Sequence, residues 1–268
     1  MNREVSDQLI AVKLGGSVIT YKQKREAVNV RAIKSLAKSI VRAMRSKDGP
    51  KRIFLVHGGG SFGHYWATRF GIGKESHGVS AEGISRTRLS MIKLHSKVLQ
   101  ILCDSGLPCE TVAASELVSS SFKEINEIGR RHVSTCFKLG LTPITFGDIL
   151  LTKFGARVIS GDRLAELIAR TFDVRRVVFV TNVDGVYEGG DSKGKLIRVI
   201  TKQSKFVSEN QERDVTGGMS MKVSAGLSIA QNGSDVFFVN GKRVEQVVRA
   251  LCGKPILGTH IPSVRVHS

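Results

Sequence analysis

The sequence predicts an α/β protein built around a mainly parallel sheet, and two features of the chain carry this prediction. Short apolar runs alternate with segments whose apolar residues recur at helical spacing, which is the pattern of parallel strands joined by helices. Glycine-rich turns follow two of the apolar runs, and α/β proteins bind ligands at the carboxyl ends of their strands. The 268 residues, 41% of them hydrophobic, suffice for one large or two fused globular units with an ample core.

The first strand is predicted at residues 9–14, an apolar run that ends in glycines. Asn29 can cap the helix that follows, because its side chain can accept a hydrogen bond from a backbone N–H of the first turn. The apolar positions of this helix fall on one face and are Val30, Ile33, Ala37, Ile40, Val41 and Met44. The second strand, at 53–57, runs into three glycines, and a further helix is expected to begin near Ser61.

A long helix is predicted to begin after Ser80 and to stop at Gly106, a residue type typical of helix C-termini. Its apolar stripe consists of Ile84, Met91, Leu94, Val98, Ile101 and Leu102. Strands are then expected near 110–113 and at 141–147, and a short returning strand is expected at 156–160.

Asp162 begins the next helix, whose apolar stripe is Leu164, Leu167, Ile168 and Phe172. The strongest strand of the sequence follows at 177–181 and runs into Asp184-Gly185, a good turn pair. The last third is expected to contain a polar loop at 188–195, a helix ending near Asn232, a strand at 236–239, a helix at 244–251 and a closing strand at 255–261. No Pro/Ser-rich linker divides the chain, so two lobes without a flexible hinge are predicted.

The formal net charge of +18 is compatible with nucleic-acid binding, because basic proteins often contact phosphates. The lysines and arginines are, however, spread along the whole chain, and only three tyrosines and one tryptophan are available for base stacking. A solvated basic surface explains the charge better. Such a surface would also speed the encounter with polyanionic small molecules.

The sequence contains no apolar stretch of the roughly 20 residues needed to cross a bilayer, and its N-terminus lacks the apolar core of a signal peptide. We therefore expect a cytoplasmic protein that does not contact membranes. The cysteines form no Cys-x-x-Cys pair and have no histidine at zinc-finger spacing, so reduced thiols are expected at Cys103, Cys109, Cys136 and Cys252.

Residues 57–64 read His-Gly-Gly-Gly-Ser-Phe-Gly-His directly after the second predicted strand. Three successive glycines let backbone N–H groups approach an anion, and a helix N-terminus would add its positive dipole there. A second glycine element, Lys13-Leu14-Gly15-Gly16-Ser17, follows the first strand. A loop histidine without a role is the ordinary alternative for His64, but the two glycine elements together favour a phosphate pocket.

Several separated motifs occur in one order along the chain: Lys13-Leu14-Gly15-Gly16-Ser17-Val18-Ile19-Thr20 with Lys22, Gly58-Gly59-Gly60-Ser61-Phe62-Gly63-His64, Phe146-Gly147-Asp148, Ile159-Ser160-Gly161-Asp162, Thr181-Asn182-Val183-Asp184-Gly185-Val186-Tyr187, and Asp214-Val215-Thr216-Gly217-Gly218-Met219 with Lys222. The ordered set resembles the amino acid kinase superfamily over nearly the full length, and within it the isopentenyl phosphate kinases. The resemblance implies a three-layer αβα sandwich with a central, mainly parallel twisted sheet. It also implies one domain over 1–268, with an N-terminal acceptor lobe (about 1–172), a C-terminal nucleotide lobe (about 173–268), and a homodimer.

The reaction that the resemblance implies is transfer of the γ-phosphoryl group of ATP to isopentenyl phosphate, with Mg²⁺ carried by the nucleotide. A phosphate monoester, whose second pKa is about 6, is already anionic at neutral pH, so the acceptor needs no general base. Donor and acceptor repel one another as they approach. The site must therefore supply cations and N–H groups.

On the matching positions, the resemblance assigns catalysis to Lys13, Lys22, His64 and Lys222. It assigns ATP contacts to Lys13, Gly15, Gly16, Ser17, Gly60, Asp162, Asn182, Asp184, Tyr187, Gly218 and Lys222. The acceptor phosphate is assigned to Gly59, Gly60, His64 and Gly147. Asp162 could orient lysines or magnesium-bound water, or it could simply cap its helix, and no dedicated metal ligands are expected because no carboxylate cluster forms a cage.

Two alternatives remain open. The first is a kinase for another small phosphate or phosphonate, such as fosfomycin. The second is a basic nucleic-acid-binding protein on a kinase-like fold, which would explain the charge but not Lys13, His64 and Lys222 at motif positions.

The sequence departs from the family pattern at Tyr21, Arg163 and Asn182, where acidic residues are common, which affects the metal and nucleotide details. The pocket for an isoprenoid tail has candidate residues that could equally belong to the core, namely Phe70, Ile72, Val79, Ile84 and Ile149.

Overall fold

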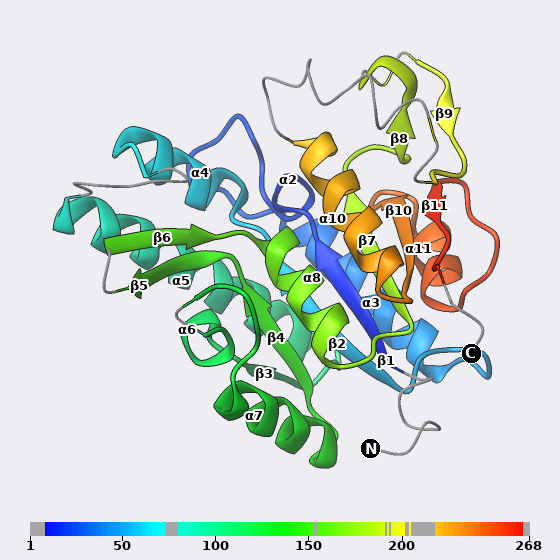
Figure 1. Cartoon of the computed structure of the whole chain (residues 1–268), viewed down its shortest axis with the longest axis horizontal. Helices are drawn as coiled ribbons and strands as arrows, with labels where there is room; N and C mark the ends of the chain where they lie inside the picture. Colours follow the sequence, from blue (N-terminus) through cyan, green and yellow to red (C-terminus); the bar gives the residue numbers. More distant parts are fainter. Residues whose placement is uncertain are drawn as a thin grey trace.

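Seven strands form one twisted sheet at the centre of the computed structural model, in the order β11-β10-β7-β1-β2-β4-β3 (Figure 1). The structure describes residues 9–72, 80–119, 121–152, 155–190, 192, 194–201, 204 and 218–264. The strands are β1 (Leu9–Leu14), β2 (Arg52–His57), β3 (Cys109–Thr111), β4 (Thr142–Phe146), β7 (Arg176–Thr181), β10 (Asp235–Asn240) and β11 (Thr259–Ile261). The sheet is parallel except at β11, which pairs antiparallel with β10, so the predicted mainly parallel sheet is confirmed.

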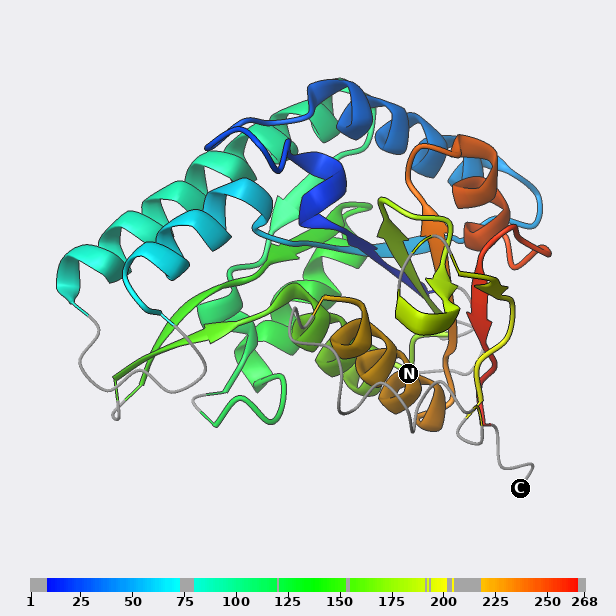
Figure 2. The same cartoon turned by 90° about the horizontal axis from the view of Figure 1, so that it is seen from above.

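Helices cover both faces of this sheet, which makes the fold a three-layer αβα sandwich (Figure 2). The helices on one face include α3 (Val30–Arg45), α5 (Ala81–Asp104) and α11 (Val244–Leu251), and those on the other include α7 (Glu127–Lys138), α8 (Gly161–Thr171) and α10 (Met219–Gln231). Successive residues of β1 point to opposite faces, as the pleat of a strand requires. Leu9 and Ala11 therefore belong to one buried apolar cluster, and Ile10 and Val12 belong to the other.

The helix starts show which sequence signals were correct. The Asn29 side chain accepts from the Ala32 N–H, so the predicted cap is confirmed, and the predicted start of the long helix after Ser80 is confirmed because Ser80 accepts from the Gly83 N–H. The cap of α8 is Ser160, which accepts from the Arg163 N–H. Of the two roles left open for Asp162, capping is therefore excluded, since Asp162 is the second residue of the helix.

Helix α7 was not predicted, because its buried face consists of only Gly129, Val133 and Cys136. Two short helices were also missed, α2 (Gly16–Ile19) and α6 (Ala114–Leu117). The strand predicted at 255–261 covers only 259–261, because backbone groups before it bond elsewhere: the Leu257 N–H donates to the Gln246 side chain. None of the described helices has the length and apolar character of a membrane span.

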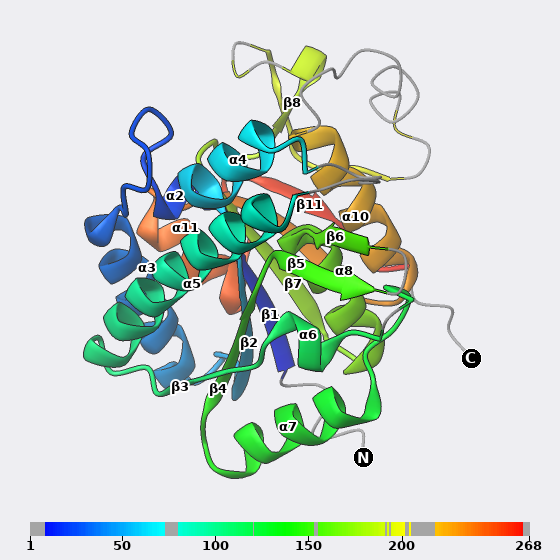
Figure 3. The same cartoon turned by 90° about the vertical axis from the view of Figure 1, so that its left-hand side faces the viewer.

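Two small hairpins flank the main sheet. The strands β5 (Asp148–Thr152) and β6 (Gly155–Ile159) pair antiparallel, as the predicted returning strand requires (Figure 3). The predicted polar loop at 188–195 contains a 3₁₀ turn at Glu188–Gly190 and is enclosed by β8 (Val186–Tyr187) and β9 (Leu196–Ile197). Asp214 to Gly217 of the last motif lie outside the described residues.

The glycine loops after β1 and β2 touch one another through their backbones. A Cβ atom at Gly16 would lie 2.3 Å from the Gly60 nitrogen and 2.6 Å from its Cα. Gly60 has φ +50°, a conformation that L side chains rarely adopt. Thr20 stabilises the contact between the two loops, because its hydroxyl donates to the Gly16 carbonyl (2.7 Å) and accepts from the Ser61 N–H (3.0 Å). Glycine is therefore required here for packing, whatever its part in the anion pocket expected from the sequence.

A buried histidine pair lies behind the second glycine loop. His57 Nε2 is 3.0 Å from His95 Nδ1, His95 Nε2 is 2.8 Å from the Thr111 hydroxyl, and His57 Nδ1 is 3.2 Å from the Gly58 carbonyl. The Gly58 carbonyl can only accept, so in two neutral rings each hydrogen bond has one possible direction, from Thr111 through His95 to His57 and Gly58. Both rings stack on Phe146.

We predict that Gly16→Ala lowers the free energy of unfolding by about 1–3 kcal/mol, the usual cost of overpacking where neither side can yield. Urea denaturation measures this change. Ser17→Ala is the matched control, because the neighbouring Ser17 already carries a Cβ atom. A Gly16→Ala protein as stable as the wild type would contradict the backbone contact.

Acid should destabilise the protein through the histidine pair. Burial, the adjacent His95 and the Lys13 charge lower the pKa of His57 to about 3, and burial lowers that of His95 to about 4. The unfolded chain, with histidine pKa values near 6.5, binds more protons below that pH, so stability falls as the pH drops. At pH 5 each histidine should cost about 2 kcal/mol relative to neutral pH.

Urea denaturation of His95→Gln at pH 7 and at pH 5 tests this prediction. The variant should lose less stability between these pH values than the wild type does. His132→Gln, on α7, should retain the wild-type loss. Equal losses in all three proteins would show that the buried pair does not cause the acid sensitivity.

Candidate active site

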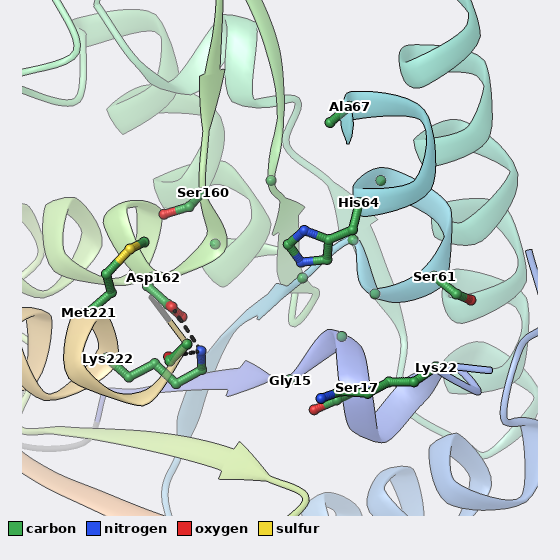
Figure 4. Close-up of a pocket in the computed structure, with 18 of the residues that line it drawn as sticks. Gly15, Ser17, Lys22, Ser61, His64, Ala67, Ser160, Asp162, Met221 and Lys222 are labelled. Carbon is green, nitrogen blue, oxygen red and sulfur yellow. Dashed lines mark hydrogen bonds and ion pairs between the residues drawn. The ribbon is translucent and has the colours of Figure 1, made fainter. Parts of the chain in front are cut away.

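A cavity of about 1450 Å³ opens at the carboxyl ends of β1, β2 and β7 (Figure 4). It is bounded by both glycine loops, the start of α8 and the start of α10. The residues predicted from the sequence that line it are Lys13, Gly15, Gly16, Ser17, Lys22, Gly59, Gly60, His64, Gly147, Asp162, Asn182, Tyr187, Gly218 and Lys222. Segments far apart in the chain therefore gather their polar groups around one space.

The Asp162 carboxylate lies between two ammonium groups. Its Oδ1 is 2.7 Å from Lys13 Nζ, and its Oδ2 is 3.4 Å from Lys222 Nζ (Figure 4). Lys13 comes from β1, Asp162 from α8 and Lys222 from α10, so the three charges join three elements. Lys222 Nζ also donates to the Gly218 carbonyl, at 2.6 Å.

Burial and charge act in opposite directions on these groups. Burial alone would raise the pKa of Asp162, but Lys13 and Lys222 outweigh it and hold the pKa below its usual value. Lys13 is only 5% exposed, and burial, together with the Lys222 charge, lowers its pKa although Asp162 opposes the shift. Asp162 is thus the counter-ion that allows two lysines to lie at the edge of the core.

His64 projects into the cavity from α4 (Gly60–Arg69), the helix that begins in the second glycine loop (Figure 4). Burial lowers its pKa, and so do the charges of Lys222, Lys13 and Lys22, while Asp162 opposes them. All three lysines are therefore close enough to act on the imidazole. The ring is neutral at neutral pH in this structure and offers one N–H donor; a bound phosphate would oppose the lysines and favour the imidazolium.

Gly147 lies at the corner between β4 and β5, and its N–H is already used. This N–H donates to the His57 carbonyl, at 3.2 Å. A Cβ atom at Gly147 would lie 3.1 Å from both the Gly161 nitrogen and the Ile159 carbonyl oxygen. Gly147 therefore lets this corner pack against the start of α8, which is a different use from the phosphate contact expected from the sequence.

The loop after β7 divides its polar residues between two tasks. Asn182 and Tyr187 line the cavity, and the Asn182 side chain accepts from the Ser17 hydroxyl at 3.3 Å. Asp184, in contrast, is not among the residues that line this cavity. Its carboxylate accepts from Asn240 (2.9 Å) and from Arg243 (2.7 Å), so it connects the β7 turn to the start of α11.

Sequence reasoning did not assign several other lining residues to the site, among them Gln23, Arg25, Thr87, Met91 and Asp148. Met91 was interpreted only as part of the apolar stripe of α5. A helix residue at the rim of the core serves both purposes, and periodicity does not separate them. The described residues contain no group of three or more His, Cys, Asp or Glu side chains placed to hold a metal ion.

Four of the five apolar candidates for a tail pocket gather in one place. Ile72, Ile149 and Ala156 form a separate buried cluster, against which Ala67, Phe70 and Ile84 pack. Ala67 and Ile149 also line the cavity. The fifth candidate, Val79, lies outside the described residues.

Comparisons of the sequence with known proteins all indicate the same family. The model of the amino acid kinase family matches residues 8–240. The isopentenyl phosphate kinase of Methanothermobacter thermautotrophicus is 30% identical over 94% of this chain and 98% of its own length. That of Methanocaldococcus jannaschii is 27% identical, with the same coverage of 94% and 98%.

A solved structure agrees with these sequences. The product complex of T. acidophilum isopentenyl phosphate kinase superposes with a TM-score of 0.75 at 26% identity, covering 94% of this chain and 99% of that one. The family model, the full-length relatives and the solved structure therefore agree. This chain belongs to the amino acid kinase family and is related, within it, to the isopentenyl phosphate kinases.

Proposed function

We propose that this protein transfers the γ-phosphoryl group of ATP to the phosphate of isopentenyl phosphate, giving isopentenyl diphosphate and ADP. The observation that carries the proposal is the convergence of Lys13, Lys22, Lys222 and His64 on one cavity. Two anions must approach each other in this reaction, and fixed cations compensate their repulsion as charge moves between them. The relatives named isopentenyl phosphate kinase support the choice of acceptor.

We propose that the acceptor phosphate binds beside His64, Gly59 and Gly60, in the lobe formed by about residues 1–172. The nucleotide would lie across the cavity, in part against the lobe formed by about residues 173–268. The residues proposed for its contacts are Gly15, Gly16, Ser17, Asn182, Tyr187 and Gly218. The homodimer and the cytoplasmic location expected from the sequence stay predictions.

In-line transfer needs no base here, because an acceptor oxygen that is already anionic attacks the γ-phosphorus. Lys13 and Lys222 would bind the phosphoryl oxygens, and Asp162 would hold the two ammonium groups in place. Mg²⁺ bound with ATP would neutralise part of the triphosphate charge. Because Asp162 is already paired with two lysines, the nucleotide phosphates fit as the main ligands of the Mg²⁺ ion.

The apolar cluster supports an acceptor with a hydrocarbon tail. Ala67 and Ile149 connect the cavity to the buried cluster around Ile72. A five-carbon alkenyl group would bury apolar surface there, whereas a small polar phosphonate would fill less of it. This difference favours isopentenyl phosphate over fosfomycin.

A coupled assay of ADP release tests the function directly, with isopentenyl phosphate, dimethylallyl phosphate and fosfomycin compared side by side. We expect the highest kcat/KM with isopentenyl phosphate. Preferred turnover of fosfomycin would establish the phosphonate alternative instead. Absence of turnover with all three acceptors, together with salt-sensitive binding of RNA or DNA, would favour the nucleic-acid-binding alternative.

His64→Ala should lower kcat by about 10²–10³-fold, the usual effect of removing one donor that stabilises transition-state charge. ATP affinity, measured by calorimetry, should change little because His64 is proposed to face the acceptor. His132→Ala, on the surface helix α7, is the matched control. Equal losses of turnover and of nucleotide affinity would contradict the placement of His64 at the acceptor.

A further inference from the structure

The segment that carries Lys22 is a short loop between α2 and α3. Thr20 and Val28 form an antiparallel bridge at its base, and the Tyr21 N–H donates to the Ala27 carbonyl at 2.9 Å. Lys22 and the neighbouring Gln23 and Arg25 line the cavity, whereas Lys24 is not among the lining residues. The loop therefore presents one side to the cavity, and its exposed lysine would need support to keep a fixed position.

Two hydrogen bonds attach this loop to α4 on either side of Lys22. At the base of the loop, the Ser61 N–H donates to the Thr20 hydroxyl at 3.0 Å. Beyond Lys22, Trp66 Nε1 donates to Glu26 Oε1 at 2.7 Å. The loop thus lies along α4, the helix that also carries His64 (Figure 2).

Arg25 adds a third contact to the same helix. Its guanidinium carbon is 4.5 Å from the centres of both the Tyr65 and the Trp66 rings. The two rings meet edge to face, at 5.1 Å and 85°. A cation over an aromatic face is attracted by the ring quadrupole, and Trp is the strongest such partner.

The conformation of Glu26 indicates that these contacts hold the loop against backbone strain. Glu26 has φ +48°, in the left-handed region, which is uncommon for a residue other than glycine. Such a conformation persists where the surroundings enforce it. Burial opposes ionisation of Glu26, but the Trp66 hydrogen bond and the nearby Ser90, Lys93 and Arg25 lower its pKa on balance, so a carboxylate accepts the indole N–H.

We propose that Glu26 and Trp66 form a clamp that positions Lys22 for phosphoryl transfer, so that Lys22 and His64 are held by one helix. This inference rests on the proposed kinase function. Glu26 and Trp66 act through Lys22 and are positioning residues. A loose loop would still let substrates bind, but it would place the Lys22 ammonium correctly less often during transfer, and misplacement of about 1 Å can cost as much as 10²-fold in rate.

The first test compares steady-state turnover of ATP and isopentenyl phosphate. Glu26→Ala and Trp66→Phe should each lower kcat about 10-fold or more, with both KM values changed by less than about 3-fold. Glu26→Gln should retain most of the activity, because its amide oxygen can still accept from Trp66. Lys24→Ala, in the same loop, is the matched control and should behave like the wild type.

The second test asks whether Glu26 acts through Lys22. In a Lys22→Ala background, adding Glu26→Ala should lower kcat by no more than about 2-fold, because the group that the clamp positions is already absent. If the kcat loss of the double variant equals the product of the losses of the two single variants, the proposal is overturned.

The third test uses fluorescence, because Trp66 is the single tryptophan of the chain. Glu26→Ala should increase the quenching of Trp66 emission by acrylamide while its circular dichroism spectrum remains that of the folded wild type. Glu26→Gln should leave the quenching unchanged. Unchanged quenching, or a wild-type kcat in Glu26→Ala, would overturn the clamp. A wild type that turns over no acceptor would overturn the proposed function instead, and the quenching would still decide whether Glu26 holds Trp66.

Discussion

The Asp162 carboxylate is the constraint on which the rest of the site depends. Two ammonium groups at the edge of a hydrophobic core repel each other, and burial lowers the pKa of Lys13. A carboxylate 2.7 Å from Lys13 and 3.4 Å from Lys222 opposes both effects. These residues come from β1, α8 and α10. The two lysines therefore have their counter-ion only when the fold has brought these three elements together.

Close contact between the two glycine loops sets the opposite wall of the cavity. Gly16 and Gly60 meet backbone to backbone, and Thr20 bonds to both loops. Helix α4 begins at this contact, which determines where His64 lies relative to Lys13. The glycines that suggested an anion pocket therefore have a second use, because a side chain at Gly16 would push apart the two elements that form the pocket.

The parts of the molecule that follow from local signals could be predicted from the sequence. Apolar runs predicted the main strands, and Asn29 and Ser80 predicted the starts of α3 and α5. The ordered motifs predicted that Lys13, His64 and Lys222 lie around one cavity. Long-range polar partners could not be predicted, since they leave no periodic signal. Ser160 and Asp162 are both good capping residues, and only the lysines from β1 and α10 distinguish their tasks. Asp184 and its partner Arg243 are 59 residues apart in the sequence, so no local signal predicts that they pair.

The site separates groups that supply charge from groups that supply position. Lys13, Lys22 and Lys222 carry positive charge that faces the cavity, whereas the histidine pair behind Gly58 is neutral and contributes directed hydrogen bonds and stacking on Phe146. A charged pair at that depth would add repulsion beside Lys13 and would cost desolvation. Neutral support behind a charged wall therefore leaves the wall's positive charge facing the cavity without a further charge buried in the core. The net charge of +18 is a separate property, because its lysines and arginines are spread along the whole chain, whereas these three ammonium groups converge on one cavity.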